Sequence, residues 1–267
     1  MSGPTLLMLV LFFLSGATGL VYEVLWTRQL ALIFGVTTYA VSAVLATYMG
    51  GLALGSWLVG RRVDRVRNPL LVYALLEAAI GAYALLVPWL LTALRPLYVE
   101  LAQLGLSYPA FSLCRSLLAV LLLLLPTTLM GGTFPVLVQH WSRLGLGVKR
   151  GTGILYFVNT GGAIFGCSLA GFLLLETLGL TGTNRLAAGT NLLLAGAAVL
   201  VARRLPETAT SSEDQESHAG EQALAPPVAR LVLLCAALSG FISLVAQVLW
   251  SRALLRYLYN STYAFTA

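Results

Sequence analysis

One carboxylate stands out among the side chains that could do chemistry, because Glu77 lies inside an apolar run that covers residues 69–93. A charge in the middle of a bilayer costs at least about 2.5 kcal/mol on insertion scales, so an acid in this position needs a reason. Two interpretations are open. Glu77 is either a proton or cation partner that faces the interior of a helix bundle, or a hydrogen-bonded packing residue.

Three further polar side chains are candidates for a substrate path. Asn159 lies in another apolar run, and we expect it to hydrogen-bond across helices or to a ligand, with interhelical bonding as the simpler use. Glu23 and Arg28 lie late in the first apolar run, on either side of Trp26. An interfacial anchor with snorkelling side chains is the simplest account of that pair.

No residue pattern indicates catalysis or a metal site. The three cysteines, Cys114, Cys167 and Cys235, lie inside apolar runs without metal-ligand spacing, which favours helix packing over ligation or disulfide bonding. We therefore expect no catalytic residue, no metal and no cofactor in this chain.

The composition requires a membrane protein to carry these residues. Hydrophobic residues make up 58% of the 267 residues, charged residues only 10%, and the mean hydropathy is +0.87. The net charge of +6 comes from basic residues in short connections between apolar runs, where they set topology. We expect the bilayer, and not nucleic acid, as the partner.

Apolar runs long enough to cross a bilayer, about 20 residues each, recur along the chain. They cover approximately residues 5–34, 37–60, 69–93, 110–138, 152–176, 184–202 and 230–258, and an eighth begins near Ser261. Basic residues concentrate in the connections after the second, fourth and sixth runs: Arg61, Arg62, Arg65, Arg67, Arg143, Lys149, Arg150, Arg203 and Arg204. These connections and the N-terminus are therefore predicted to be cytoplasmic.

The chain also repeats itself. Residues 15–28, SGATGLVYEVLWTR, return as residues 239–252, SGFISLVAQVLWSR, at a constant offset of 224 that also matches Tyr39 with Tyr263. Glu23 is replaced by Gln247, whereas Trp26 and Arg28 are retained. Six spans separate the copies, so the second unit enters the membrane in the same direction as the first. Parallel six-helix repeats are the arrangement of the two major-facilitator halves.

We therefore predict an all-α, polytopic transmembrane bundle with three parts. Residues 1–204 form a major-facilitator-like six-helix half, residues 205–229 an acidic, flexible cytosolic linker, and residues 230–267 the start of a second, parallel repeat. Because the chain stops a few residues into the second helix of the new unit, we expect it to be a fragment of a longer protein.

Small residues and prolines predict where helices approach or break. The spacing of Gly51 with Gly55, and of Gly162 with Gly166, is typical of closely packed helices. The segment PTTLMGGTFP places Pro126 and Pro135 around Gly131 and Gly132, which predicts a kinked or broken helix. Such a break is either a bend satisfied by threonine hydroxyls or a moving part that lines a substrate site.

The segments 15–28, 48–56, 126–135 and 156–162 together resemble the membrane domain of bacterial fused major-facilitator/spermidine synthase proteins. The resemblance covers nearly the whole chain in matching order. It implies a bacterial cytoplasmic membrane, a downstream aminopropyltransferase-like catalytic domain, and a polyamine as the molecule handled. The glycine-rich, Rossmann-like signature of that catalytic domain does not occur in this sequence, so the resemblance places no catalytic residue here.

A second similarity concerns the connection after the second run. Gly60, Asp64 and Arg65 are similar to the major-facilitator signature between helices two and three, although Val66-Arg67 stands where that signature has a later glycine. In that family the loop is thought to latch the two halves on the cytoplasmic side. The alternative is an ordinary positive-inside loop.

Two hypotheses of different classes follow. The chain is the membrane domain of a spermidine-synthase-like fusion, which anchors the enzyme or handles its amine, or it is half of a secondary transporter for a small, cationic solute. A third hypothesis, a membrane subunit that only packs against partner proteins, has no sequence feature that specifically supports it. In either of the first two cases a cationic amine suits Glu77 in sign.

Overall fold

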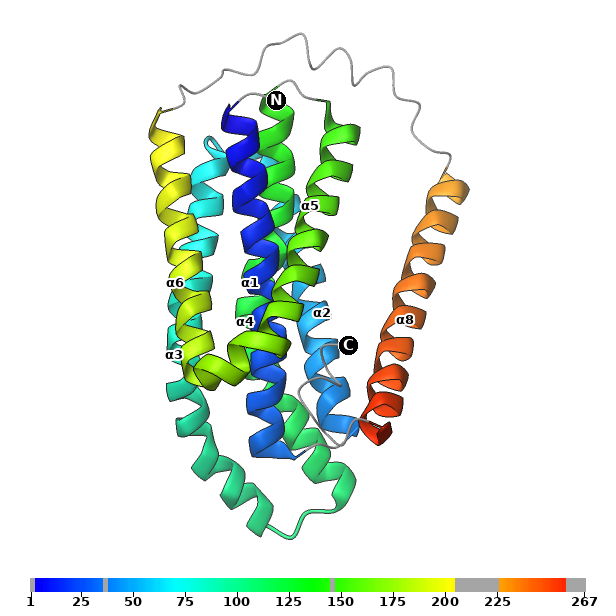
Figure 1. Ribbon diagram of the computed structural model, residues 1–267. Helices are drawn as coiled ribbons and strands as arrows, with labels where there is room; N and C mark the ends of the chain where they lie inside the picture. The colour runs from blue at the N-terminus through cyan, green and yellow to red at the C-terminus, as the bar shows by residue number, and fades with distance from the viewer. Residues whose placement is uncertain (1–2, 36–37, 145–146, 205–225, 258–267) are drawn as a thin grey trace.

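A computed structural model describes residues 3–35, 38–144, 147–204 and 226–257, and every long element in these ranges is a helix (Figure 1). The helices are α1 (Gly3–Phe34), α2 (Thr38–Gly60), α3 (Pro69–Gln103), α4 (Tyr108–Arg143), α5 (Val148–Leu169), α6 (Leu175–Arg204) and α8 (Pro226–Tyr257). They correspond to the seven complete apolar runs. Six helical stretches of the described residues are long and apolar enough to cross a membrane. One of these, Gly151–Arg204, covers most of α5 and all of α6.

The reversal between α5 and α6 has a local cause. A π-helical turn, η2 (Ala170–Leu174), ends α5, and Gly179 follows with φ 65° and ψ −176°. This conformation is accessible to glycine because it lacks a Cβ atom. The chain therefore turns back at Gly179, and α6 runs in the opposite direction to α5 (Figure 1).

Helices α3 and α4 are longer than their apolar runs. They have 35 and 36 residues, and α3 continues to Gln103 although Arg95 and Glu100 end its apolar stretch. Charged residues stop a hydropathy run without stopping a helix. The ring of Tyr98 packs against those of Phe34 and Phe111, with centroids 5.2 and 5.5 Å away, and this holds the extension although Pro96 lies inside it. The extension of α3 projects at the end opposite the N-terminus (Figure 1), whereas α4 exceeds its run mainly at its carboxyl end, up to Arg143.

The break predicted in α4 is not present. The helix is continuous from Tyr108 to Arg143, with Pro126 and Pro135 inside it and Gly131 and Gly132 between them. Threonine hydroxyls bond back to carbonyls of the preceding turn, as Thr127 Oγ1 does to Leu123 O at 2.6 Å. The helix is therefore not broken here, and of the two alternatives predicted for this segment the threonine hydroxyl bonds agree with the first, a stretch that these hydroxyls satisfy.

Two neighbouring helices supply donors to carbonyls that prolines leave free. A proline removes the bond to the carbonyl four residues earlier, which is Leu122 O for Pro126 and Ala84 O for Pro88. The hydroxyl of Tyr83 donates to Leu122 O at 2.7 Å, and Nδ2 of Asn184, on α6, donates to Ala84 O at 2.7 Å. The prolines thus create acceptors that tie α3 to α4 and α6 to α3.

Replacing Asn184 by leucine is expected to lower the free energy of unfolding by about 1–2 kcal/mol, because Ala84 O would be buried without a donor. Adding Pro88→Ala should recover much of this loss, since residue 88 would regain the N–H that bonds Ala84 O within α3. Thermal unfolding of both variants in detergent checks this. An Asn184→Leu loss that Pro88→Ala leaves unchanged would contradict the assignment.

The glycine pairs predicted to mediate close packing do so. On α2, an added Cβ at Gly51 would meet the Thr127 side chain, and one at Gly55 would meet the backbone carbonyl of Thr128. On α5, Gly162 and Gly166 lie in the same way against the carbonyls of Phe13 and Ala17 on α1. The α2–α4 and α1–α5 crossings are therefore backbone-to-backbone contacts, as small residues permit in lipid.

Helix α8 runs in the same direction as α1, as the repeat predicted, and contacts α2 (Figure 1). It begins at Pro226, four residues before the predicted start of the second repeat. The rest of the predicted linker, residues 205–225, and the eighth span near Ser261 lie outside the described residues.

The two ends and the sides of the bundle differ in chemistry. The N-terminal end of α1 and the carboxyl ends of α2, α4 and α6 lie at one end (Figure 1). Most of the basic residues lie at or next to these carboxyl ends. The sides expose large apolar side chains, including Trp89 and Phe157, each 77% exposed, and Leu193, 76% exposed. An apolar outer surface of this kind is that of a multi-pass membrane protein.

Candidate functional site

A polar layer divides the interior of the bundle between two apolar clusters. On α1, α3 and α6 the residues Ser15, Glu77 and Asn191 separate one cluster, with Phe12, Leu76 and Leu194 as members, from another, with Val21, Ile80 and Ala188 as members. Along each of these three helices, apolar side chains in the interior are thus followed by a polar side chain and then by apolar ones again, at the same depth in the bundle. Glu77, eight residues into α3, lies about 12 Å along the helix from Pro69.

Glu77 is fully buried and is the centre of this layer. Ser15 Oγ donates to its Oε1 at 2.5 Å, and Asn191 Nδ2 donates to its Oε2 at 2.6 Å. Tyr22 OH donates to Asn191 Oδ1 at 3.0 Å, which fixes the orientation of the amide. Both carboxylate oxygens therefore accept hydrogen bonds, and these come from neutral side chains.

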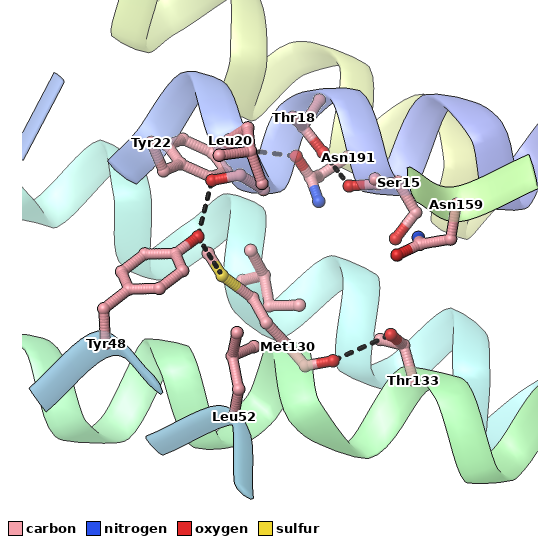
Figure 2. Close-up of a pocket in the computed structure, with 13 residues that line it drawn as sticks. Ser15, Thr18, Leu20, Tyr22, Tyr48, Leu52, Met130, Thr133, Asn159 and Asn191 are labelled. Carbon is pink, nitrogen blue, oxygen red and sulfur yellow. Dashed lines mark hydrogen bonds between the residues drawn. The ribbon is translucent and has the colours of Figure 1, made fainter. Parts of the chain in front are cut away.

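A cavity of about 90 Å³ adjoins the layer. Figure 2 shows Ser15, Asn159 and Asn191 along one side of it and Tyr48, Met130 and Thr133 along the other. Glu77 does not line this cavity, but two of its hydrogen-bond partners, Ser15 and Asn191, do, whereas a third, Tyr73, does not. A group bound in the cavity would contact the carboxylate through these two side chains or by displacing one of them.

Asn159 both contacts a neighbouring helix and lines the cavity. Its Nδ2 donates to Phe12 O on α1 at 3.2 Å, so the predicted interhelical bond is confirmed, and its side chain also lines the cavity. Gly16 on α1 makes this approach possible, because a Cβ there would meet the backbone carbonyl of Asn159. The structure therefore brings Asn159 and Glu77 to the same region from α5 and α3.

Glu23 and Arg28 do not form the interfacial pair that was predicted. Glu23 is 6% exposed and Trp26 1%, so both lie inside the protein, whereas Arg28 is exposed. Five residues on a helix correspond to 500°, which places Glu23 and Arg28 on different faces. The anchor interpretation was wrong for Glu23 and Trp26, because α1 is covered by other helices over this stretch.

The predicted loop motif is held by a residue outside it. Gly60 ends α2, and Asp64 and Arg65 lie in a short 3-10 turn, η1 (Val63–Arg65), with both side chains exposed. Arg143, at the end of α4, donates from Nη2 to Val66 O at 2.6 Å and from Nη1 to Arg67 O at 2.7 Å. The loop is thus fixed to α4 through backbone carbonyls.

The sequence analysis missed one buried cation. Arg115, on α4, is 6% exposed and donates from Nη1 to Phe34 O at 2.9 Å and from Nη2 to Ser112 Oγ at 3.0 Å. Its guanidinium also lies 4.8 Å from the centroid of the Phe111 ring. Arg115 therefore caps the carboxyl end of α1, where a cation is favourable. An arginine within the fourth apolar run, residues 110–138, is the sequence feature that could have indicated this buried cation.

Asn191 was also missed, although it shares a pattern with Asn184. The two asparagines are seven residues apart on α6, close to two helical turns, so they lie on one face. Both are buried, and both donate to α3, Asn184 to a backbone carbonyl and Asn191 to Glu77. This spacing in an apolar run could have indicated a polar face.

Comparisons with known proteins give no neighbour: no family model, no curated protein and no solved structure matches the chain. The part of the chain that the structure describes contains no group of three or more metal-ligating side chains that could hold an ion.

Proposed function

We propose that this chain is a solute-handling membrane domain, a major-facilitator-like six-helix half followed by the start of a second repeat, whose site binds the cationic end of a small organic amine. The observation that supports this most is the setting of Glu77: a fully buried carboxylate whose hydrogen-bond partners Ser15, Asn191 and Tyr73 are all neutral, and of which Ser15 and Asn191 line a cavity. A buried charge without a counter-ion is costly, and a bound cation would offset that cost.

The size of the cavity limits what this half can hold. Sites for drug-sized ligands occupy about 300–1,000 Å³, whereas this cavity has about 90 Å³. It has room for an ammonium group and a few adjoining atoms. The remainder of a longer amine would extend towards the second repeat, as expected where a site lies between two repeats.

The resemblance to fused spermidine synthase proteins supplies the class of amine. In that setting the amine is a polyamine made or used by an aminopropyltransferase-like domain, and the membrane is the bacterial cytoplasmic membrane. The end of the bundle that carries most of the basic residues, with the N-terminus, would face the cytoplasm. The alternative is a membrane anchor for that enzyme, in which Glu77 serves packing alone.

Uptake of labelled spermidine by proteoliposomes tests the proposal. Glu77→Gln keeps the shape and the ability to accept a hydrogen bond but removes the charge, so uptake is expected to fall at least about tenfold, the effect of losing one charge-assisted interaction. Glu100→Gln is the matched control, because it removes an acid from the exposed end of the same helix.

The outcomes separate the hypotheses. Selective loss in Glu77→Gln, with the control unchanged, supports a cation site. Undiminished uptake in Glu77→Gln would remove Glu77 from the mechanism. Absence of both uptake and spermidine binding in the parent protein would refute the proposal and leave the anchor hypothesis.

A further inference from the structure

The two copies of the repeat meet at equivalent positions. Glu23 of α1 hydrogen-bonds with the side chain of Gln247 on α8. These residues are 224 positions apart, the offset that relates the two repeats. The contact therefore joins a residue to its own counterpart in the second unit.

This coincidence locates the symmetry axis. When two parallel units are related by a two-fold rotation, a residue can contact its own counterpart only if both lie next to the axis. Helices α1 and α8 run in the same direction (Figure 1), as such a rotation about the membrane normal requires. The axis therefore passes between Glu23 and Gln247.

Two side chains that face each other across a two-fold axis must be chemically compatible. A strictly repeated glutamate would face another glutamate, and two buried carboxylates repel each other. An acid facing an amide avoids this, because the amide N–H donates to the carboxylate. We infer that Glu23 and Gln247 form the axial contact that joins the two repeats, and that the change from acid to amide between the copies is what makes this contact attractive.

The contact also places the cavity relative to the second repeat. Gly19 lies one helical turn before Glu23 and Thr27 one turn after it, on the same face of α1. Gly19 lines the cavity, so the cavity lies beside the axis. Glu23 Oε2 and Thr27 Oγ1 are buried, with no hydrogen-bond partner within the described ranges. The contact with Gln247 therefore lies on the face of α1 that also borders the cavity.

A charge-swap series in the full chain tests the inference. Gln247→Glu should lower Tm by several degrees, because it places two carboxylates at the axis, whereas Glu23→Gln/Gln247→Glu should restore Tm to near that of the parent, since acid and amide have only exchanged places. The substitution Gln247→Glu is thus compared in a protein that has Glu23 and in one that has glutamine at residue 23. An equal loss in both backgrounds would overturn the inference.

Cross-linking gives a second measurement if a swap variant does not fold. Cys114, Cys167 and Cys235 are first replaced by alanine, and Glu23→Cys/Gln247→Cys is treated with a short bismaleimide. Peptide mass spectrometry should find the intramolecular cross-link at much higher yield than in Glu23→Cys/Ser243→Cys, in which the second cysteine lies one turn earlier on α8. Equal yields, or no 23–247 cross-link, would contradict an axial contact.

Discussion

Gly55→Val is expected to lower the free energy of unfolding by about 3 kcal/mol or more, the upper end of overpacking effects. The added side chain would occupy the position of the Thr128 carbonyl, and a Cβ alone already reaches the backbone N of Gly132 at 3.0 Å. Backbone atoms cannot rotate away as a side chain can, so α2 and α4 would have to separate. Thermal unfolding in detergent should show a Tm lower by roughly 6–12 °C, or a failure to give monodisperse protein.

Gly50→Val is the control for this prediction. Gly50 lies on the same helix, and an added Cβ meets nothing within 4 Å. The two substitutions therefore change helix propensity equally, but Gly50→Val leaves the contact between α2 and α4 intact. A Tm within about 2 °C of the parent is expected, since surface substitutions change stability by roughly 0.5 kcal/mol or less. Equal effects of the two substitutions would show that α2 and α4 do not touch at Gly55.

Hydropathy and glycine spacing predicted the elements and two of their contacts. The runs of residues 5–34 and 37–60 match α1 and α2 to within two residues, because a sustained apolar stretch long enough for the bilayer has few alternatives to a helix. The far end of α3 could not be predicted in the same way. Its last turns carry Arg95, Pro96 and Glu100 and are held by the packing of Tyr98 against Phe34 and Phe111, which a hydropathy run does not reveal.

The proline-rich segment of α4 shows why local signals are insufficient. Pro126 predicts a break if only its own helix is considered, since Leu122 O loses its donor. Tyr83, 43 residues earlier in the chain, supplies the replacement. Whether a proline breaks a helix or ties two helices together thus depends on a partner that only the folded bundle brings near.

The candidate site was predicted in part for the same reason. Glu77 could be recognised because a carboxylate in an apolar run is expensive. Its partners Ser15 and Asn191 are 62 and 114 residues away. The spacing of Asn191 with Asn184 could indicate a polar face on α6, but nothing local to either partner indicates that it meets Glu77. Glu23 was misplaced because depth along α1 predicts the membrane interface, whereas the neighbouring helices determine which face is buried.

Asn191→Leu is expected to lower the free energy of unfolding by about 3 kcal/mol, because the similar size of leucine avoids strain but two buried groups, Glu77 Oε2 and Tyr22 OH, each lose a partner at roughly 1.5 kcal/mol. Thermal unfolding should show a Tm lower by roughly 6–12 °C. Thr190→Leu is the adjacent control. The Thr190 hydroxyl bonds only to Leu186 O within α6 among the bonds described, so its loss should leave Tm nearly unchanged.

A second substitution distinguishes a lost network from general damage. In Glu77→Met/Asn191→Leu the carboxylate that Asn191 served is itself absent, so the double variant should be less destabilised than the sum of the two single variants. Such non-additivity is expected only for side chains that act as one unit, as Ser15, Glu77 and Asn191 do in the polar layer. Strictly additive losses would mean that the layer is a set of independent packing contacts, and a bound cation would then have no network to complete.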